Sequence, residues 1–181
     1  MIRLMQAALF LIKGLCLKLF SRKSVLIDGV GRISMKAEFL TRNGGMIEVG
    51  KNVRVCEGAS ISADGGRITL GEKVFLNRGV ILRCHGRIEI GEGTLVAPNV
   101  SLFDHNHRFD TGGVCDGYSV GSIKIGKKCW IGANATILKN TQIGDGCVIG
   151  AGCVVSGVIP AHSLVTSNRD LLVRPIEPRD P

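Results

Sequence analysis

The sequence predicts an all-β fold, a parallel β-helix of about six coils with a short N-terminal helix and one protruding loop. Two observations lead to this prediction. Large aliphatic residues recur every six positions over most of the 181-residue chain, and Gly-containing breaks group these hexads in threes. The composition agrees, because 25 Gly and only 4% aromatic residues suit a chain of tight turns around an aliphatic core.

The segment 1–24 is basic and apolar, and its pattern predicts a helix. Leu4, Leu11 and Leu15 share one helical face, whereas Lys13 interrupts the apolar run before it reaches the roughly 20 residues that span a bilayer. Two roles stay open for this helix. It caps the end of the core, or it lies in the plane of an anionic membrane with its basic residues toward the headgroups. No small-residue cleavage site follows, so a secretory signal peptide is not expected. We expect a cytoplasmic protein, which in the second of these roles is in peripheral contact with the inner face of the plasma membrane.

The clearest repeats fill residues 125–160, which read IGKKCW, IGANAT, ILKNTQ, IGDGCV, IGAGCV and VSGVIP. Earlier triplets of hexads begin at Val49, Leu70 and Ile90, and a weaker triplet begins at Ile27. Six extended residues span roughly 20 Å, enough for one short strand and one corner. The first residue of a hexad and the small residue four positions later should point inward, with Gly at the turn. Three hexads then close a triangular coil that buries its core by stacking on its neighbours.

These repeats assign residues 25–165 to the β-helix domain and residues 166–181 to a C-terminal tail. The net charge of +8 fits solubility, an anionic membrane or a phosphorylated cofactor. Nucleic acid is not an expected partner, because the chain has no zinc-finger, homeodomain or stacked-aromatic pattern. Seven Cys without a CxxC pair argue against a disulfide framework, and Cys129, Cys147 and Cys153 fall in small-residue positions of the repeat.

The repeat breaks at FDHNHRFD, residues 103–110, and the loop 108–122 follows with three Gly in its middle. In an extended segment His105 and His107 point to the same side. A neutral imidazole can take a proton from a hydroxyl near neutral pH, but a solvated loop histidine is the alternative. A metal site is not expected, because no acidic or Cys cluster completes the histidine pair.

The repeat, together with NHRFD, CWIGANATIL and IGDGCVIGAGCVVSGVIP, resembles the hexapeptide-repeat acyltransferases. It is most similar to the branch that holds the galactoside, maltose and streptogramin acetyltransferases and many polysaccharide O-acetyltransferases. The resemblance covers roughly residues 27–175. It implies a left-handed β-helix, a homotrimer with active sites between neighbouring subunits, acetyl-CoA as donor substrate and a carbohydrate acceptor.

The same resemblance implies roles for the residues on the acceptor side. His107 matches the catalytic histidine of the family and acts as general base. Asn77 matches an asparagine that helps to hold the acceptor. His85 stands where related enzymes carry an aspartate that contacts the acceptor sugar, so a different acceptor is expected. His105 lines the acceptor pocket or orients the base, or it is ordinary polar packing.

On the donor side, the resemblance places Trp130 along the pantetheine groove. The backbones of Ala133 and Ala151 correspond to positions that hydrogen-bond the pantetheine arm, and Ser156 lies where relatives carry Ser or Thr near the adenine.

Relatives carry a GNPA-like run where this chain has SNRD, residues 167–170. Arg169 and Arg174 remain candidates for the CoA phosphates.

The resulting functional prediction is an O-acetyltransferase that moves an acetyl group from acetyl-CoA to a carbohydrate hydroxyl. The acceptor is expected in cell-surface polysaccharide biosynthesis, namely O-antigen, capsule or exopolysaccharide. The alternatives are a small acceptor, such as an antibiotic, serine or amino sugar, and a non-catalytic β-helix scaffold.

Overall fold

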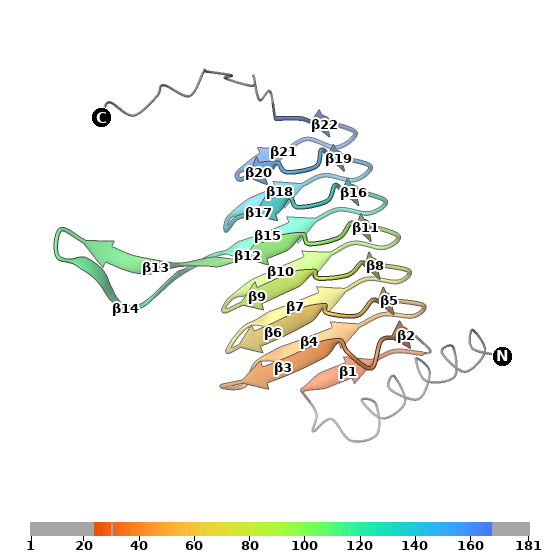
Figure 1. The fold of residues 1–181 in the computed structure, drawn as a ribbon, viewed down its shortest axis with the longest axis horizontal. Coiled ribbons are helices and arrows are strands. Elements are labelled where there is room, and N and C mark those ends of the chain that lie inside the picture. Colours follow the sequence, from red (N-terminus) through yellow and green to blue (C-terminus); the bar gives the residue numbers. More distant parts are fainter. Residues whose placement is uncertain (1–23, 30, 168–181) are drawn as a thin grey trace, which may run out of the picture.

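The computed structural model describes residues 24–29 and 31–167, which form a tall stack of triangular coils (Figure 1). Three parallel sheets, here called A, B and C, form the faces of the stack and contain seven, seven and six strands. The predicted fold class, a left-handed parallel β-helix of about six coils with one protrusion, is confirmed. The helix predicted within residues 1–24 lies almost entirely outside the described residues.

Each sheet takes one strand from every coil. Sheet A contains β1 (Val25–Ile27), β4 (Met46–Val49), β7 (Arg67–Leu70), β10 (Arg87–Ile90), β15 (Ser122–Ile125), β18 (Thr141–Ile143) and β21 (Val158–Ile159). Sheet B contains β2 (Arg32–Ile33), β5 (Arg54–Val55), β8 (Phe75–Leu76), β11 (Leu95–Val96), β16 (Trp130–Ile131), β19 (Val148–Ile149) and β22 (Leu164–Val165). Sheet C contains β3 (Glu38–Arg42), β6 (Ser60–Asp64), β9 (Ile81–Cys84), β12 (Ser101–Phe103), β17 (Thr136–Ile137) and β20 (Val154–Val155).

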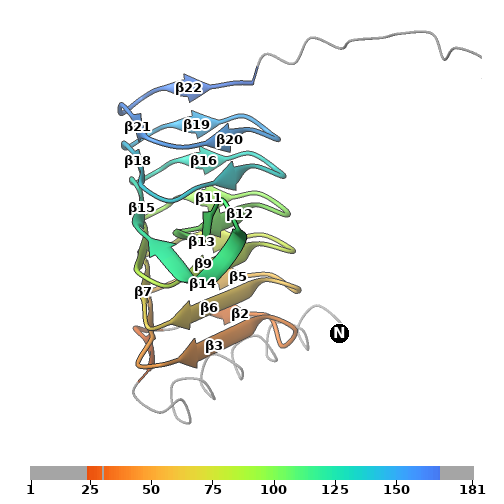
Figure 2. The same cartoon turned by 90° about the vertical axis from the view of Figure 1, so that its left-hand side faces the viewer.

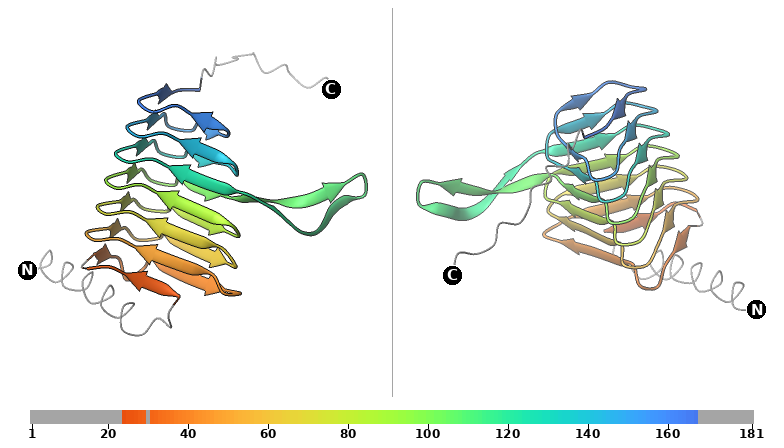
Figure 3. Two further views of the ribbon diagram at one scale, coloured as in Figure 1. Left: turned by 180° about the vertical axis from the view of Figure 1, so that it is seen from behind. Right: turned by 45° about the horizontal axis from the view of Figure 1, so that its top comes forward.

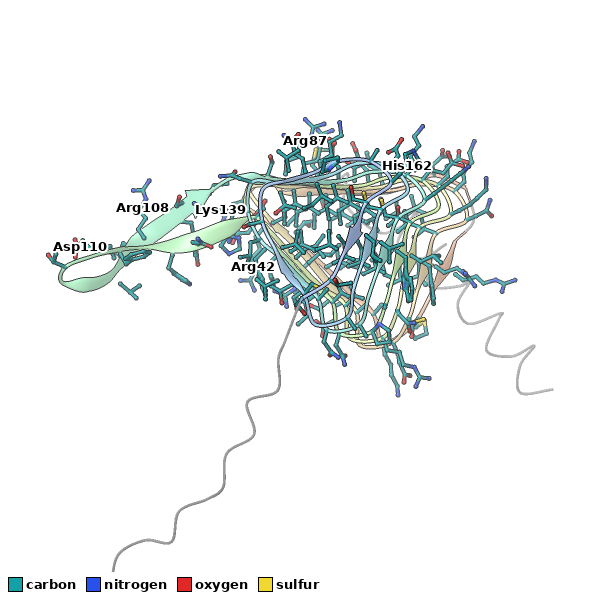
Figure 4. The ribbon with its side chains drawn as sticks, turned by 90° about the horizontal axis from the view of Figure 1, so that it is seen from above. Arg42, Arg87, Arg108, Asp110, Lys139 and His162 are labelled. Carbon is teal, nitrogen blue, oxygen red and sulfur yellow. The ribbon has the colours of Figure 1, made fainter. Side chains whose placement is uncertain are left out.

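The core follows the hexad pattern. The opening aliphatic residue and the small residue four positions later are both buried, as for Ile131 with Ala135 and for Ile143 with Cys147. Seen along the axis, the coils superimpose into a triangle whose interior is filled by side chains (Figure 4). Each coil therefore covers the apolar faces of the coils on either side of it.

The Gly at the second position of the hexads allows the main chains of neighbouring coils to approach each other closely. A Cβ at Gly126 would lie 2.6 Å from the main chain of Gly144 in the next coil. The left-handed backbone conformation is found instead two residues later in the turn, where Asn and Lys share it with Gly; Asn99 and Lys128 have φ of 58° and 52°. The sequence prediction placed Gly correctly at the corner, but its main role at the second position is steric.

The break in the repeat is an antiparallel hairpin, formed by β13 (His105–Asp110) and β14 (Gly113–Val120). It projects sideways from the stack between β12 and β15 (Figures 1 and 2). It thus begins three residues before the expected loop 108–122 and is regular rather than irregular. The register shifts between His107 and Arg108, where the pairing skips Asp116 and Gly117 of β14, which marks a bulge in β14 opposite the middle of β13.

The β-helix continues across this insertion without a change of register. β10 pairs with β15 from Arg87↔Ser122 to Ile90↔Ile125, although 31 residues separate the two strands. Views from behind and from above show the hairpin leaving the stack at a single coil (Figure 3). None of the described segments is a helix with the length and hydropathy that a bilayer span requires.

Candidate functional site

Four aromatic rings gather where the hairpin leaves the stack. His85 lies in the turn between β9 and β10, and its ring centroid is 4.1 Å from that of His105 and 4.3 Å from that of Tyr118. Tyr118 also contacts His105 and His107, with centroid distances of 5.0 and 4.8 Å. Tyr118 thus contacts three of the predicted site residues, His85, His105 and His107. We call these four side chains the ring cluster.

The hairpin register explains how His107 meets Tyr118, because the two residues are directly opposite each other on β13 and β14. His105 is two residues earlier on β13, so its side chain emerges on the same side, as the sequence predicted. His107 itself is exposed. It is thus accessible to a substrate, and the side chain of His105 keeps 13% of its surface exposed.

Asp104 lies beneath the ring cluster with its side chain fully buried. Its Oδ1 accepts a hydrogen bond from the His85 N–H at 2.9 Å, and its Oδ2 accepts one from the Gly86 N–H at 2.8 Å. The Nδ1 atom of His105 lies 3.0 Å from Oδ1. Its carbonyl oxygen accepts from the Gly121 N–H at 2.7 Å, so Asp104 joins both ends of the hairpin to the preceding coil.

Cys84 lies beside this carboxylate but is not a candidate nucleophile. Burial, followed by the negative charge of Asp104, strongly raises the pKa of the Cys84 thiol. The thiol donates to the Arg67 carbonyl at 3.3 Å. It therefore stays protonated and packs as a small apolar group.

A cavity of about 540 Å³ opens along the hairpin beside His107. It is lined by Asn106, His107, Arg108, Phe109, Asp110, Cys115, Ser119 and Lys139. Figure 4 shows Lys139 at the root of the hairpin, with Arg108 and Asp110 farther from the stack. Lys139 donates to the Ser119 hydroxyl, so the cavity carries cationic groups next to the exposed imidazole.

The remaining acceptor candidate, Asn77, is not part of the ring cluster. It lies in the turn between β8 and β9, which we call the B–C corner, and its side chain accepts from the Arg78 N–H at 2.8 Å. His85 and the hairpin lie at the other end of sheet C, at the C–A corner. Within one chain, the structure thus separates Asn77 from the three histidines.

Three of the candidate donor residues, Trp130, Ala133 and Ala151, lie at a different corner or face of the coil from the hairpin. Trp130, on the outer face of sheet B, is 54% exposed, and its strand neighbours are Leu95 and Val148. Ala133 and Ala151 follow at the B–C corner of successive coils, where the Ala133 carbonyl accepts from the Gly152 N–H at 2.8 Å.

A solvent-facing indole, followed along the chain by small corner residues, suits an extended ligand with apolar and amide groups, as pantetheine is. Ser156 is exposed in the turn between β20 and β21, at the C–A corner. Arg169 and Arg174 lie outside the described residues.

Metal ligands do not assemble in the part of the chain that the structure describes, where no group of three or more His, Cys, Asp or Glu side chains is arranged around a common point. The six cysteines of that part are free thiols. Cys129, Cys147 and Cys153 are buried, as their positions in the hexads predicted.

Sequence reasoning missed two members of the site, Asp104 and Tyr118. Asp104 stands directly before His105 and takes the place that the small, buried residues Ala63 and Cys84 occupy in the two preceding coils. Tyr118 is the single Tyr of the chain and lies in a polar, Gly-rich insertion. Both signals were visible, since a charged residue in a core position and a lone aromatic in a polar loop each need a partner.

Comparisons with known proteins agree with this fold. The family model of the bacterial transferase hexapeptide (six repeats) matches residues 122–157. A putative lipopolysaccharide biosynthesis O-acetyl transferase of Escherichia coli, WbbJ, is 33% identical over 68% of this chain and 69% of its own length. A probable acetyltransferase of Mycobacterium tuberculosis is 35% identical over 69% of this chain, which spans only 45% of that longer relative.

Among solved structures, a variant of the N-acyltransferase AntD from Bacillus cereus superimposes with a TM-score of 0.68. The match covers 88% of both chains at 23% identity, and that protein was crystallised with coenzyme A and dTDP-4-amino-4,6-dideoxyglucose. At this identity the similarity establishes the fold.

Proposed function

The chain belongs to the bacterial hexapeptide-repeat transferases, and from that premise we propose that it is a CoA-dependent O-acetyltransferase acting on a carbohydrate hydroxyl. The observation that carries the proposal is the interrupted coil, which presents an exposed His107 beside a cavity on a hairpin. A β-helix scaffold needs no such insertion, whereas a base that must reach a substrate does.

His107 acts as the general base. It takes the proton of the acceptor hydroxyl as the hydroxyl oxygen attacks the thioester carbonyl. The ester C–O bond forms, the C–S bond breaks, and the proton passes from the imidazole to the departing thiolate. No acyl-enzyme is required, and the buried, protonated Cys84 is not suited to forming one.

Acetyl-CoA is the donor substrate and runs along sheet B. Trp130 packs against the pantetheine arm, and the backbones at Ala133 and Ala151 bond its amide groups. Ser156 lies near the adenine, and Arg169 and Arg174 meet the phosphates.

The active unit is a homotrimer. The base lies at the C–A corner, whereas Trp130 lies on sheet B and Ala133 and Ala151 lie at the B–C corner of the same chain. A second copy must therefore bring its B–C corner, with Asn77, to the hairpin of the first. The exposed hairpin supports this arrangement, because Phe109 and Val114 are paired across its strands and are each 78% exposed. A solvent-exposed apolar pair of this kind gains by packing on another subunit.

The acceptor is a cell-surface polysaccharide or its lipid-linked precursor. The similarity to WbbJ supports this choice, and so does His85, which replaces the acceptor-binding aspartate of the sugar acetyltransferases. We place the enzyme in the cytoplasm, in peripheral contact with the inner face of the plasma membrane through the basic segment 1–23. Deleting that segment should then reduce binding to anionic vesicles.

A nucleotide-linked amino sugar is the second candidate acceptor, because AntD shares the fold and was crystallised with one. The deciding experiment incubates the protein with acetyl-CoA and a panel of O-antigen, capsule and exopolysaccharide fragments, free serine and dTDP-amino sugars. Release of CoA thiol identifies the acceptor, and mass spectrometry with alkaline hydrolysis separates an ester from an amide. Thiol release with serine or amino sugars alone would reject the carbohydrate O-acetyl proposal.

A further inference from the structure

Asp104 is the only buried residue with an ionisable carboxylate among the residues that the structure describes. It lies in the first position after β12, where the chain leaves the stack, and the mechanism above gives it no role. A buried carboxylate is costly unless each of its oxygens is hydrogen-bonded. The role of such a carboxylate therefore lies in the groups that it positions by hydrogen bonds.

The hydrogen-bond partners of Asp104 determine which ring nitrogen of His105 carries the proton. The N–H groups of His85 and Gly86 are donors, so both carboxylate oxygens already act as acceptors. A carboxylate among N–H donors accepts again from the third partner, His105 Nδ1, at 3.0 Å. The neutral His105 ring then carries its proton on Nδ1, which leaves the lone pair on Nε2.

The ring cluster holds the His105 ring beside Tyr118. His105 is 13% exposed, and its ring meets those of His85 and Tyr118 edge-on. His107 contacts the same tyrosine. Two imidazoles that emerge on one side of an extended strand, two residues apart, lie roughly 7 Å from each other, a separation that suits neighbouring hydroxyls of one sugar ring.

We propose that Asp104 is a positioning residue that fixes the Nδ1–H form of His105, and that His105 Nε2 accepts a hydrogen bond from the hydroxyl next to the one acetylated. The acceptor class is thus a sugar with two adjacent free hydroxyls. This rests on the proposed function for the acceptor, whereas the state of His105 rests on the structure alone.

The first test measures directly which ring nitrogen of His105 is protonated. Long-range ¹H–¹⁵N correlation spectra of the full-length protein, assigned with His105→Gln, should give the pattern of an Nδ1-protonated ring in the wild type. Asp104→Asn should convert His105 to the Nε2-protonated form or to a mixture. Asp145→Asn is the matched control, because Asp145 Oδ1 also accepts a backbone N–H, that of Lys127 at 2.8 Å. Its contact with a histidine is through the main chain, where the Asp145 carbonyl oxygen accepts from the His162 N–H at 2.8 Å, and the substitution leaves that bond in place.

An Nε2-protonated His105 in the wild type, or a spectrum that Asp104→Asn leaves unchanged, would overturn the proposal even if the enzyme acetylates sugars.

The second test uses the fragment acetylated in the panel above and its analogue deoxygenated at the adjacent position. His105→Leu should raise KM for the intact fragment about tenfold, the effect of one hydrogen bond, with little change in kcat. His105→Gln should restore KM, because its carbonyl oxygen can replace Nε2.

The wild type should lose the same factor on the deoxy analogue, and His105→Leu should not discriminate between the two. Equal KM of the wild type for both compounds would reject the role in recognition. If no fragment is acetylated, the proposed function fails while the spectra still decide the role of Asp104.

Discussion

Replacing Ile123 with Ala should destabilise the coil that carries the hairpin. Ile123 is fully buried in β15, where it pairs with Ile88 of β10 on one side and with Thr141 of β18 on the other. Removing three carbons forfeits about 2.4 kcal/mol of transfer free energy at about 0.8 kcal/mol per methylene. The cavity that remains between two stacked strands raises the expected loss to about 3–4 kcal/mol.

Urea unfolding followed by the fluorescence of the single tryptophan, Trp130, measures this loss, because β16 belongs to the same coil as β15. All variants are compared at one protein concentration, since assembly would stabilise the fold by mass action. Lys124→Ala is the control, because this neighbouring side chain is exposed, and it should change the free energy of unfolding by less than about 0.5 kcal/mol. A loss below about 1 kcal/mol for Ile123→Ala would refute a core that depends on stacked inward residues.

Three further predictions concern the site and its surroundings. Trp130→Ala should raise KM for acetyl-CoA about tenfold in steady-state assays, and an unchanged KM would exclude Trp130 from the donor site. Its melting temperature, followed by circular dichroism because the variant has no tryptophan, should stay near that of the wild type, since the indole is 54% exposed. Gly86→Ala should cost about 1–3 kcal/mol in urea unfolding and lower the transfer rate, because the new Cβ would lie 2.4 Å from the Gly121 carbonyl oxygen at the hairpin root. Because burial raises the pKa of Cys84, the stability that this thiol contributes is fully present below about pH 9 and is lost as the pH rises. The melting temperature should therefore fall above that pH, and it should fall less steeply in Cys84→Ala.

Much of the β-helix can be predicted from the sequence because each hexad repeats the same pattern of inward and corner residues. The inward aliphatic residue, the inward small residue and the corner fall at fixed positions of the hexad. Because each coil stacks on its neighbours, the same residue types are required at these positions in every coil. Gly126 illustrates the limit, since its place at a corner was predicted but its contact with Gly144 of the next coil required the structure.

The ring cluster was only partly predictable. His105 and His107 share a strand, so their common side follows from alternation alone. Tyr118 reaches them through the hairpin, whose register depends on the bulge in β14 and not on any two-residue turn signal. Asp104 reaches His85 because successive coils stack, which brings residues about one coil apart into hydrogen-bond contact.

The rate of acetyl transfer by His107→Ala tests the central claim most directly. The assay follows CoA thiol release at saturating acetyl-CoA with the fragment that the wild type acetylates, and thermal melting shows that the variant is folded. Loss of the general base should lower kcat by about 10² to 10⁴ while the melting temperature stays close to that of the wild type, because the side chain is exposed. A folded His107→Ala variant with kcat within about threefold of the wild type would contradict the account, since a positioned general base contributes far more than that.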